Sequence, residues 1–151
     1  MPAPTPHSQH FGYAWLALCL AFLAHAADEA LTGFLTVYNP TVLALRAQLP
    51  WFPMPTFTFG KWLAGLLAAN FLLLLLTPYA FRNSRWLRPV AWFFSTIMLL
   101  NALGHTLATL LGHTVSSVRF ARPVPGFYSS PLLLLASLYL FSALRRSAHA
   151  R

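Results

Sequence analysis

The sequence predicts an all-α membrane protein, built as a four-transmembrane-helix bundle with a Pro- and aromatic-rich interfacial loop between the first two helices. Two observations lead to this fold class. Of the 151 residues, 58% are hydrophobic and only 8% are charged, whereas a soluble domain carries roughly 25% charged residues. The apolar residues also fall into four long blocks, each close to the roughly 20 residues that a helix needs to cross the hydrocarbon core.

The four apolar blocks predict transmembrane helices over residues 12–37, 61–80, 89–112 and 127–144. Together they are expected to form one transmembrane domain that takes in the whole chain, residues 1–151. Asn39-Pro40 is expected to end the first helix, because the residue before a proline is disfavoured in the helical conformation. Pro89 suits the first turn of the third helix, where its missing amide hydrogen costs nothing.

Residues 40–60 have a different composition from the apolar blocks that flank them. Three prolines lie close together among aromatic side chains: Pro50, Pro53 and Pro55 with Trp51, Phe52, Phe57 and Phe59. Aromatic rings are enriched at the headgroup level of a bilayer, so this stretch is expected to be an interfacial loop. Such a loop can also lie over the bundle as a lid.

The basic residues predict the orientation of the chain in the membrane. The net charge is +8, and the basic residues lie almost entirely at the ends of the apolar blocks, which is typical of topology control rather than of nucleic-acid binding. The side that holds both termini carries six of them: Arg82, Arg85, Arg88, Arg145, Arg146 and Arg151. The other side carries four: Arg46, Lys61, Arg119 and Arg122. We therefore expect an integral protein of the bacterial inner (plasma) membrane with both termini in the cytoplasm.

Asp28 and Glu29 are the only acidic residues of the chain, and they lie side by side in the first apolar block, three and four residues after His25. Each residue of an α-helix advances by about 100°, so the three side chains share one sector of the helix. Ionisable groups at membrane depth are costly, and they usually face a bundle interior or a cavity in which they have a function. This cluster is therefore the first candidate for a functional site.

The third predicted helix offers a matching set of polar side chains. Asn101 and His105 are four residues apart and so face the same way. Gly104 and Gly112 are expected to let another helix approach closely, as small residues do in membrane proteins. We expect five residues to converge on a cavity between the first and third predicted helices: His25, Asp28, Glu29, Asn101 and His105.

Three motifs along the chain carry these residues. They are His25-Ala-Ala-Asp28-Glu29, then Asn101-Ala-Leu-Gly-His105, then Pro125-Gly126 with Ser129 three residues on. In this order they resemble the HXXEE family of small bacterial integral membrane proteins, and the resemblance implies a membrane architecture and a shared site rather than a particular reaction. The first acid is an aspartate where that family has glutamate. The longer Glu29 is therefore expected to take the more direct role.

The first functional hypothesis is a membrane-embedded enzyme that acts on a lipophilic substrate, for example by isomerisation or hydrolysis. Glu29 would be the base or proton donor, because general acid–base catalysis needs a titratable group in reach of the substrate. His25 and His105 would shuttle protons or orient the substrate, and Asn101 would hold a substrate oxygen or a water. In a variant of this hypothesis, His25, Glu29 and His105 bind one divalent metal, zinc or iron.

Two alternatives of a different class remain open. Acid and histidine side chains inside a membrane also relay protons, which would suit a proton-linked transporter or channel element. The small size and the lack of an inverted repeat count against it, although a homo-oligomer would supply a pathway. The second alternative is a non-catalytic lipid-binding or structural membrane subunit. In every version the partners are the lipid bilayer and a lipophilic molecule, and nucleic acid is not expected.

Overall fold

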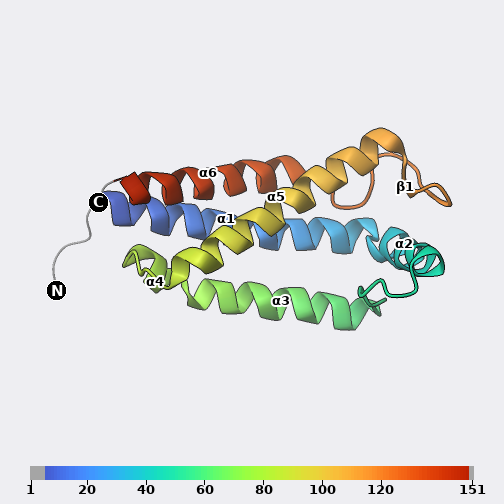
Figure 1. Cartoon of the computed structure of the whole chain (residues 1–151), viewed down its shortest axis with the longest axis horizontal. Coiled ribbons are helices and arrows are strands. Elements are labelled where there is room, and N and C mark those ends of the chain that lie inside the picture. Colours follow the sequence, from blue (N-terminus) through green and yellow to red (C-terminus); the bar gives the residue numbers. More distant parts are fainter. Residues whose placement is uncertain (1–5, 150–151) are drawn as a thin grey trace.

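The structure, a computed structural model, describes residues 6–149 and is mostly helical (Figure 1). A short antiparallel hairpin interrupts the helices after the fifth of them. In chain order the elements are α1 (Pro6–Thr32), α2 (Leu35–Gln48), α3 (Phe59–Leu75), α4 (Thr77–Phe81), α5 (Leu87–Leu111), β1 (His113–Val115), β2 (Val118–Arg119) and α6 (Ser130–His149).

Within residues 6–149, three helical segments are long and apolar enough to cross a membrane. They are Gln9–Thr32 in α1, Phe59–Phe81 formed by α3 with α4, and Leu87–Leu111 in α5. This is consistent with a membrane protein. The fourth predicted block is helical, but α6 is not among the membrane-length apolar segments within residues 6–149. Its apolar run is followed by Arg145-Arg146 within the same helix.

The core of the bundle lies between α1, α5 and α6. α6 runs along α1, and α5 packs against α6 (Figure 1). Large apolar side chains from all three helices are buried there: Phe11, Trp15, Leu18, Phe94, Leu133 and Leu140. Two hydrogen bonds tie α3 to α1, from Trp15 Nε1 to the carbonyl of Leu73 at 3.1 Å and from Asn70 Nδ2 to the carbonyl of Cys19 at 2.8 Å. Asn70 therefore links two helices, as polar residues in membrane helices often do.

The predicted end of the first helix is wrong. It was expected to continue to Val37, but α1 ends at Thr32, and Gly33 has a left-handed φ of +78°. Glycine adopts this conformation without steric cost, so it ends the helix. The chain then starts α2, which turns away from α1 at the end of the bundle opposite the chain termini (Figure 1). Pro40, expected to end a helix, lies inside α2 instead, where it removes one backbone hydrogen bond.

The Pro-rich segment after α2 is fastened to that helix by side chains. Asn39 Nδ2 donates to the carbonyl of Phe57 at 2.9 Å, and its Oδ1 accepts from the amide of Phe57 at 3.0 Å. Tyr38 donates its hydroxyl hydrogen to the carbonyl of Pro55 at 2.9 Å. On the other side of α2, Thr41 is hydrogen-bonded to Thr114 of β1. One end of the bundle is thus closed by α2, the Pro-rich segment and the hairpin.

Candidate functional site

Three of the predicted residues meet inside the bundle. Glu29 Oε1 lies 3.1 Å from His105 Nε2 and 3.5 Å from His25 Nε2. The two imidazole rings are 4.9 Å apart at their centroids and nearly perpendicular. Relative exposures of 0% for His25, 4% for Glu29 and 7% for His105 show that all three are buried. We call these three residues the His–Glu–His cluster.

Local sequence explains how two helices supply this cluster. His25 and Glu29 are one turn apart on α1, so their side chains lie on the same face. His105 reaches the same carboxylate oxygen from α5. The third side is closed by the segment between the hairpin and α6, whose backbone comes unusually near the cluster. A Cβ atom on Gly126 would lie 2.7 Å from His105 Cε1 and 2.9 Å from Glu29 Cγ.

Position 126 therefore requires a glycine for two independent reasons. Its φ of +86° is a conformation that side chains with a Cβ rarely adopt. The space that a Cβ would need is already filled by His105 and Glu29. The Pro125-Gly126 motif thus forms one wall of the cluster and packs directly against His105 and Glu29.

Asp28 lies beside the cluster and acts through Ser129. Both the backbone amide and the hydroxyl of Ser129 donate to Asp28 Oδ2, each at 2.8 Å. The Ser129 hydroxyl oxygen is also 2.8 Å from His25 Nδ1. Asp28 is thus joined to His25 through one serine, a role of Ser129 that no local sequence pattern indicates.

Threonine hydroxyls hold the segment before α6 at both of its edges. Thr32 donates to the carbonyl of Asp28 at 2.6 Å and accepts from the amide of Gly126 at 3.1 Å. Thr109 of α5 accepts from the amide of Val124 at 3.2 Å. The loop that carries Gly126 and Ser129 is therefore fixed to α1 and α5 at once.

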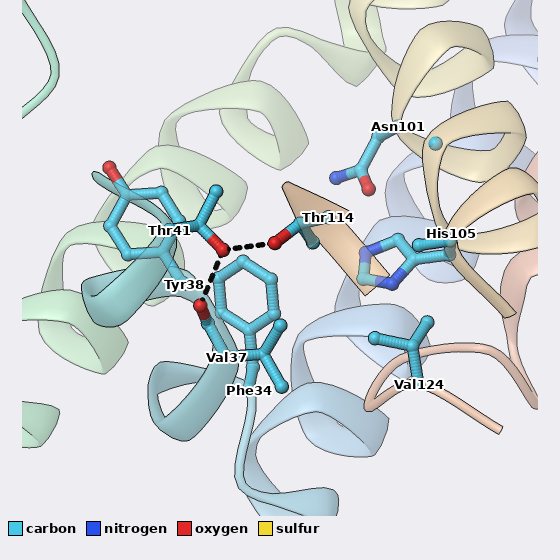
Figure 2. A pocket seen from close by; sticks show the side chains of 10 residues that line it. Phe34, Val37, Tyr38, Thr41, Asn101, His105, Thr114 and Val124 are labelled. Atoms are coloured by element: carbon cyan, nitrogen blue, oxygen red, sulfur yellow. Dashed lines mark hydrogen bonds between the residues drawn. The ribbon is translucent and has the colours of Figure 1, made fainter. Parts of the chain in front are cut away.

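A pocket of about 380 Å³ opens next to the cluster, and His105 belongs to both (Figure 2). Its volume falls within the range of small-molecule sites. The wall is mostly apolar and comes from α2 and its N-cap residue, from α5, from β1 and from the loop before α6: Phe34, Val37, Tyr38, Thr41, Asn101, Gly104, His105, Ala108, Thr114 and Val124. The expected cavity between the first and third predicted helices is thus a pocket between α5 and α2, because the chain changes direction at Gly33.

Asn101 lies in this pocket and not in the His–Glu–His cluster. Figure 2 shows its amide and the His105 ring projecting from α5 into the same space. Tyr38 stands on the α2 side. Its partial burial raises the pKa of the phenol, and this effect outweighs the opposing charge of Arg46. The phenol is therefore protonated at neutral pH and donates to the carbonyl of Pro55.

Gly104 and Gly112 were expected to admit a neighbouring helix, but Gly104 lines the pocket and Gly112 ends α5. A Cβ on Gly104 would meet nothing within 4 Å, so this residue opens onto the pocket rather than a helix contact. Gly112 has a φ of +75° and ends α5. A Cβ there would lie 2.8 Å from the side chain of Arg122.

Sequence reasoning missed the α2 side of the pocket. Phe34 and Tyr38 were placed within or just after a straight first helix, so they were not considered as lining residues. Gly33, followed within a few residues by aromatic side chains, was the available signal for a turn at this point.

Comparisons with known protein families, with curated proteins and with solved structures give no match. The likeness of three motifs to the HXXEE family stays an expectation from the sequence. The chemistry of the site has to be inferred from its own geometry.

Proposed function

We propose that this chain is a membrane-embedded enzyme that carries out proton-transfer chemistry, such as isomerisation or hydrolysis, on a lipophilic substrate. The observation that carries the proposal is the buried His–Glu–His cluster in the wall of an apolar pocket. A buried carboxylate between two imidazoles is expensive in a membrane protein. A structural role alone gives no reason for such a group to border a pocket.

In this proposal His105 is the group that meets the substrate, because it belongs to both the pocket and the cluster. Glu29, 3.1 Å behind it, takes up or returns the proton that His105 exchanges with the substrate. His25 holds the other side of the same carboxylate oxygen. Asn101, one turn before His105 on α5, offers an amide to a substrate oxygen.

The depth of the cluster supports a lipid whose reacting bond lies near its headgroup. The apolar span of α1 runs over Gln9–Thr32, so Glu29 lies about 13 Å beyond its middle at about 1.5 Å per residue. The hydrocarbon core extends about 15 Å to each side of the bilayer centre. The cluster would then lie where acyl chains meet headgroups, and bonds such as acyl esters occur at that depth.

The same proposal includes a four-helix membrane bundle with α6 as the fourth pass. Its support is that α1 begins and α6 ends at the same end of the molecule, together with α4 (Figure 1). Four passes require both chain ends on one side, and that side would hold six basic residues against four. The termini would then be cytoplasmic, and the cluster would lie toward the opposite face of the inner membrane.

Membership of the HXXEE family is also part of the proposal. The three motifs that resemble the family lie far apart in the sequence but contribute to one site. His25 and Glu29 come from the first, His105 from the second, and Gly126 with Ser129 from the third.

A proton-linked transporter is the second candidate, favoured by one specific observation. Polar groups form a series from the pocket through His105, Glu29, His25 and Ser129 to Asp28. Such a series can relay protons. In sealed vesicles a transporter would give solute-dependent proton flux, whereas an enzyme would give product without flux.

The deciding experiment measures turnover of bilayer lipids by the full-length protein reconstituted in vesicles, with mass spectrometry of the lipid extract. Glu29→Gln keeps the shape of the side chain and removes its charge, so turnover should fall at least a hundredfold while the protein still inserts. Thr106→Val is the matched control, because Thr106 is exposed and its hydroxyl donates to the carbonyl of Ala102 in its own helix. Equal product from wild type, Glu29→Gln and His105→Ala would refute the catalytic proposal.

A further inference from the structure

We infer that the His–Glu–His cluster is a binding site for one divalent first-row transition metal of the Zn²⁺ class. The ligands would be His25 Nε2, a carboxylate oxygen of Glu29 and His105 Nε2. The inference uses the site of the proposed function, but it is carried by ligand geometry and can be tested without any substrate.

The hydrogen bonds of Ser129 indicate which nitrogen of His25 carries the hydrogen. The Ser129 hydroxyl has one hydrogen, and its short contact with the Asp28 carboxylate at 2.8 Å is the strongest acceptor available to it. Its oxygen is then free to accept from His25 Nδ1, also at 2.8 Å. In the neutral imidazole, the form that binds metals, the Asp28–Ser129–His25 series therefore assigns the hydrogen to Nδ1 and leaves a lone pair on Nε2.

The lone pair on His25 Nε2 lies in a buried environment next to the Glu29 carboxylate. His25 is fully buried, and its Nε2 has no hydrogen-bond partner within residues 6–149. The nearest charged atom is Glu29 Oε1 at 3.5 Å. A lone pair on nitrogen and a carboxylate oxygen at this separation in a buried site repel unless a cation lies between them. A metal ion would satisfy both atoms together.

The distances between the three candidate ligand atoms are close to those of a zinc site. The three ligand atoms lie within 4.8 Å of one another, and two of the separations are 3.1 and 3.5 Å. A tetrahedral zinc site with bonds of about 2.0–2.1 Å has ligand atoms about 3.3–3.4 Å apart. The two separations that involve Glu29 are therefore already close to these values. A small movement of the His105 or His25 ring would shorten the third separation, between the two histidine nitrogens.

The chemistry of the donors indicates the kind of metal. Imidazole nitrogen suits zinc, iron and copper, whereas magnesium and calcium prefer oxygen ligands. Two histidines and one carboxylate leave a further coordination position open, as in catalytic zinc sites. Asp28 and Ser129 supply the outer hydrogen bond that orients a metal-bound histidine. A bound metal would add Lewis acidity beside the pocket.

The experiment titrates Co²⁺, a spectroscopic substitute for Zn²⁺, into chelator-stripped full-length protein in detergent, purified with a tag that contains no histidine. Wild type should bind one equivalent and develop the visible absorption of a low-coordinate Co²⁺ site. His25→Ala and His105→Ala should abolish that absorption. His113→Ala is the matched control, because His113 lies on β1 outside the cluster and should leave the titration unchanged.

Ser129→Ala tests the orienting series separately. It removes the hydrogen bond to His25 Nδ1 but no ligand, so the stoichiometry should stay at one while the affinity falls roughly 10–100-fold. Zn²⁺ should also raise the thermal midpoint of wild type and of Ser129→Ala, but not of His105→Ala. This second readout covers any ligand variant that folds poorly.

Two results would overturn the metal site. One is the absence of Co²⁺ absorption and of Zn²⁺ stabilisation in folded wild type, and the other is an equal loss in the His113→Ala control. If folded wild type binds no Co²⁺, yet the stripped protein turns over lipid and Glu29→Gln does not, the metal site is wrong and the proposed acid–base enzyme stands. If Co²⁺ binds but no lipid is turned over by any form, the metal site stands and the enzyme does not.

Discussion

Both halves of α1 bury side chains inside the bundle, but the partners of those side chains are of opposite kinds. In the first half Phe11, Trp15 and Leu18 are at most 1% exposed and pack against other apolar side chains. In the second half His25 and Glu29, 0% and 4% exposed, are buried among polar groups. Apolar packing tolerates many partners of suitable size, whereas a buried charge needs particular ones.

The difference explains why the loop before α6 matters so much. The apolar half is held by neighbouring helices, with contacts from α3, α4, α5 and α6 and one hydrogen bond from Trp15 to the carbonyl of Leu73. The polar half additionally requires Gly126 for space and Ser129 for a hydrogen bond, both from residues 124–129. Helix packing thus provides the fold, and one fixed loop completes the site. Substitutions in the two halves should therefore separate stability from site chemistry.

The largest loss of stability is expected from a cavity in the apolar half. Leu140 of α6 is fully buried in the core, so Leu140→Ala should lower the free energy of unfolding by about 2–5 kcal/mol. The His–Glu–His cluster is not touched, so Co²⁺ binding should survive below the unfolding temperature. The measurement is denaturation in detergent followed by Co²⁺ titration. Leu138→Ala, at a position 48% exposed on the same helix, is the control and should cost far less.

Gly126→Ala should give the reverse pattern. The positive φ costs about 1–3 kcal/mol for a residue with a Cβ, and the new methyl group would press on His105 and Glu29. We therefore expect a moderate loss of stability but at least a tenfold loss of Co²⁺ affinity and of lipid turnover. Gly65→Ala is the matched control, because a Cβ there meets nothing within 4 Å. Unchanged Co²⁺ affinity in Gly126→Ala would show that the loop does not define the site.

The sequence was sufficient for the helical class and for the elements that carry the site, because long apolar blocks and two acids in one of them are strong signals. The same-face spacing of His25 and Glu29 is a property of the helix itself and could be predicted. That His105 reaches Glu29 depends on how α5 crosses the bundle, which no local pattern encodes.

Three features of the site needed the structure because each depends on tertiary contacts. The turn at Gly33 redirects α2 over the pocket, although Asn39-Pro40 looked like the stronger helix end. Asn101 is one turn from His105 and lines the same pocket, but it is His105 that is hydrogen-bonded to Glu29. Asp28 and Glu29 are neighbours with separate partners, since adjacent residues on a helix point about 100° apart.

The smallest effect is expected at the outer side of the pocket, where Asn39 holds the Pro-rich segment by two hydrogen bonds to Phe57. Asn39→Leu removes both at similar volume and should cost about 1–3 kcal/mol locally. Limited proteolysis and hydrogen exchange should therefore report faster cleavage and exchange over residues 49–58, while Co²⁺ affinity stays unchanged. Gln48→Leu, at an exposed amide on the same helix, is the control.

The Asn39 result also bears on how the two regions are connected. The segment is attached to α2, and α2 forms one wall of the pocket through Phe34 and Tyr38. The His–Glu–His cluster instead depends on α1, α5 and the loop at Gly126. If Asn39→Leu weakened Co²⁺ binding as much as Gly126→Ala does, the pocket wall and the cluster would be one cooperative unit. Release of the segment alone would mean that substrate access can change while the chemical centre stays intact.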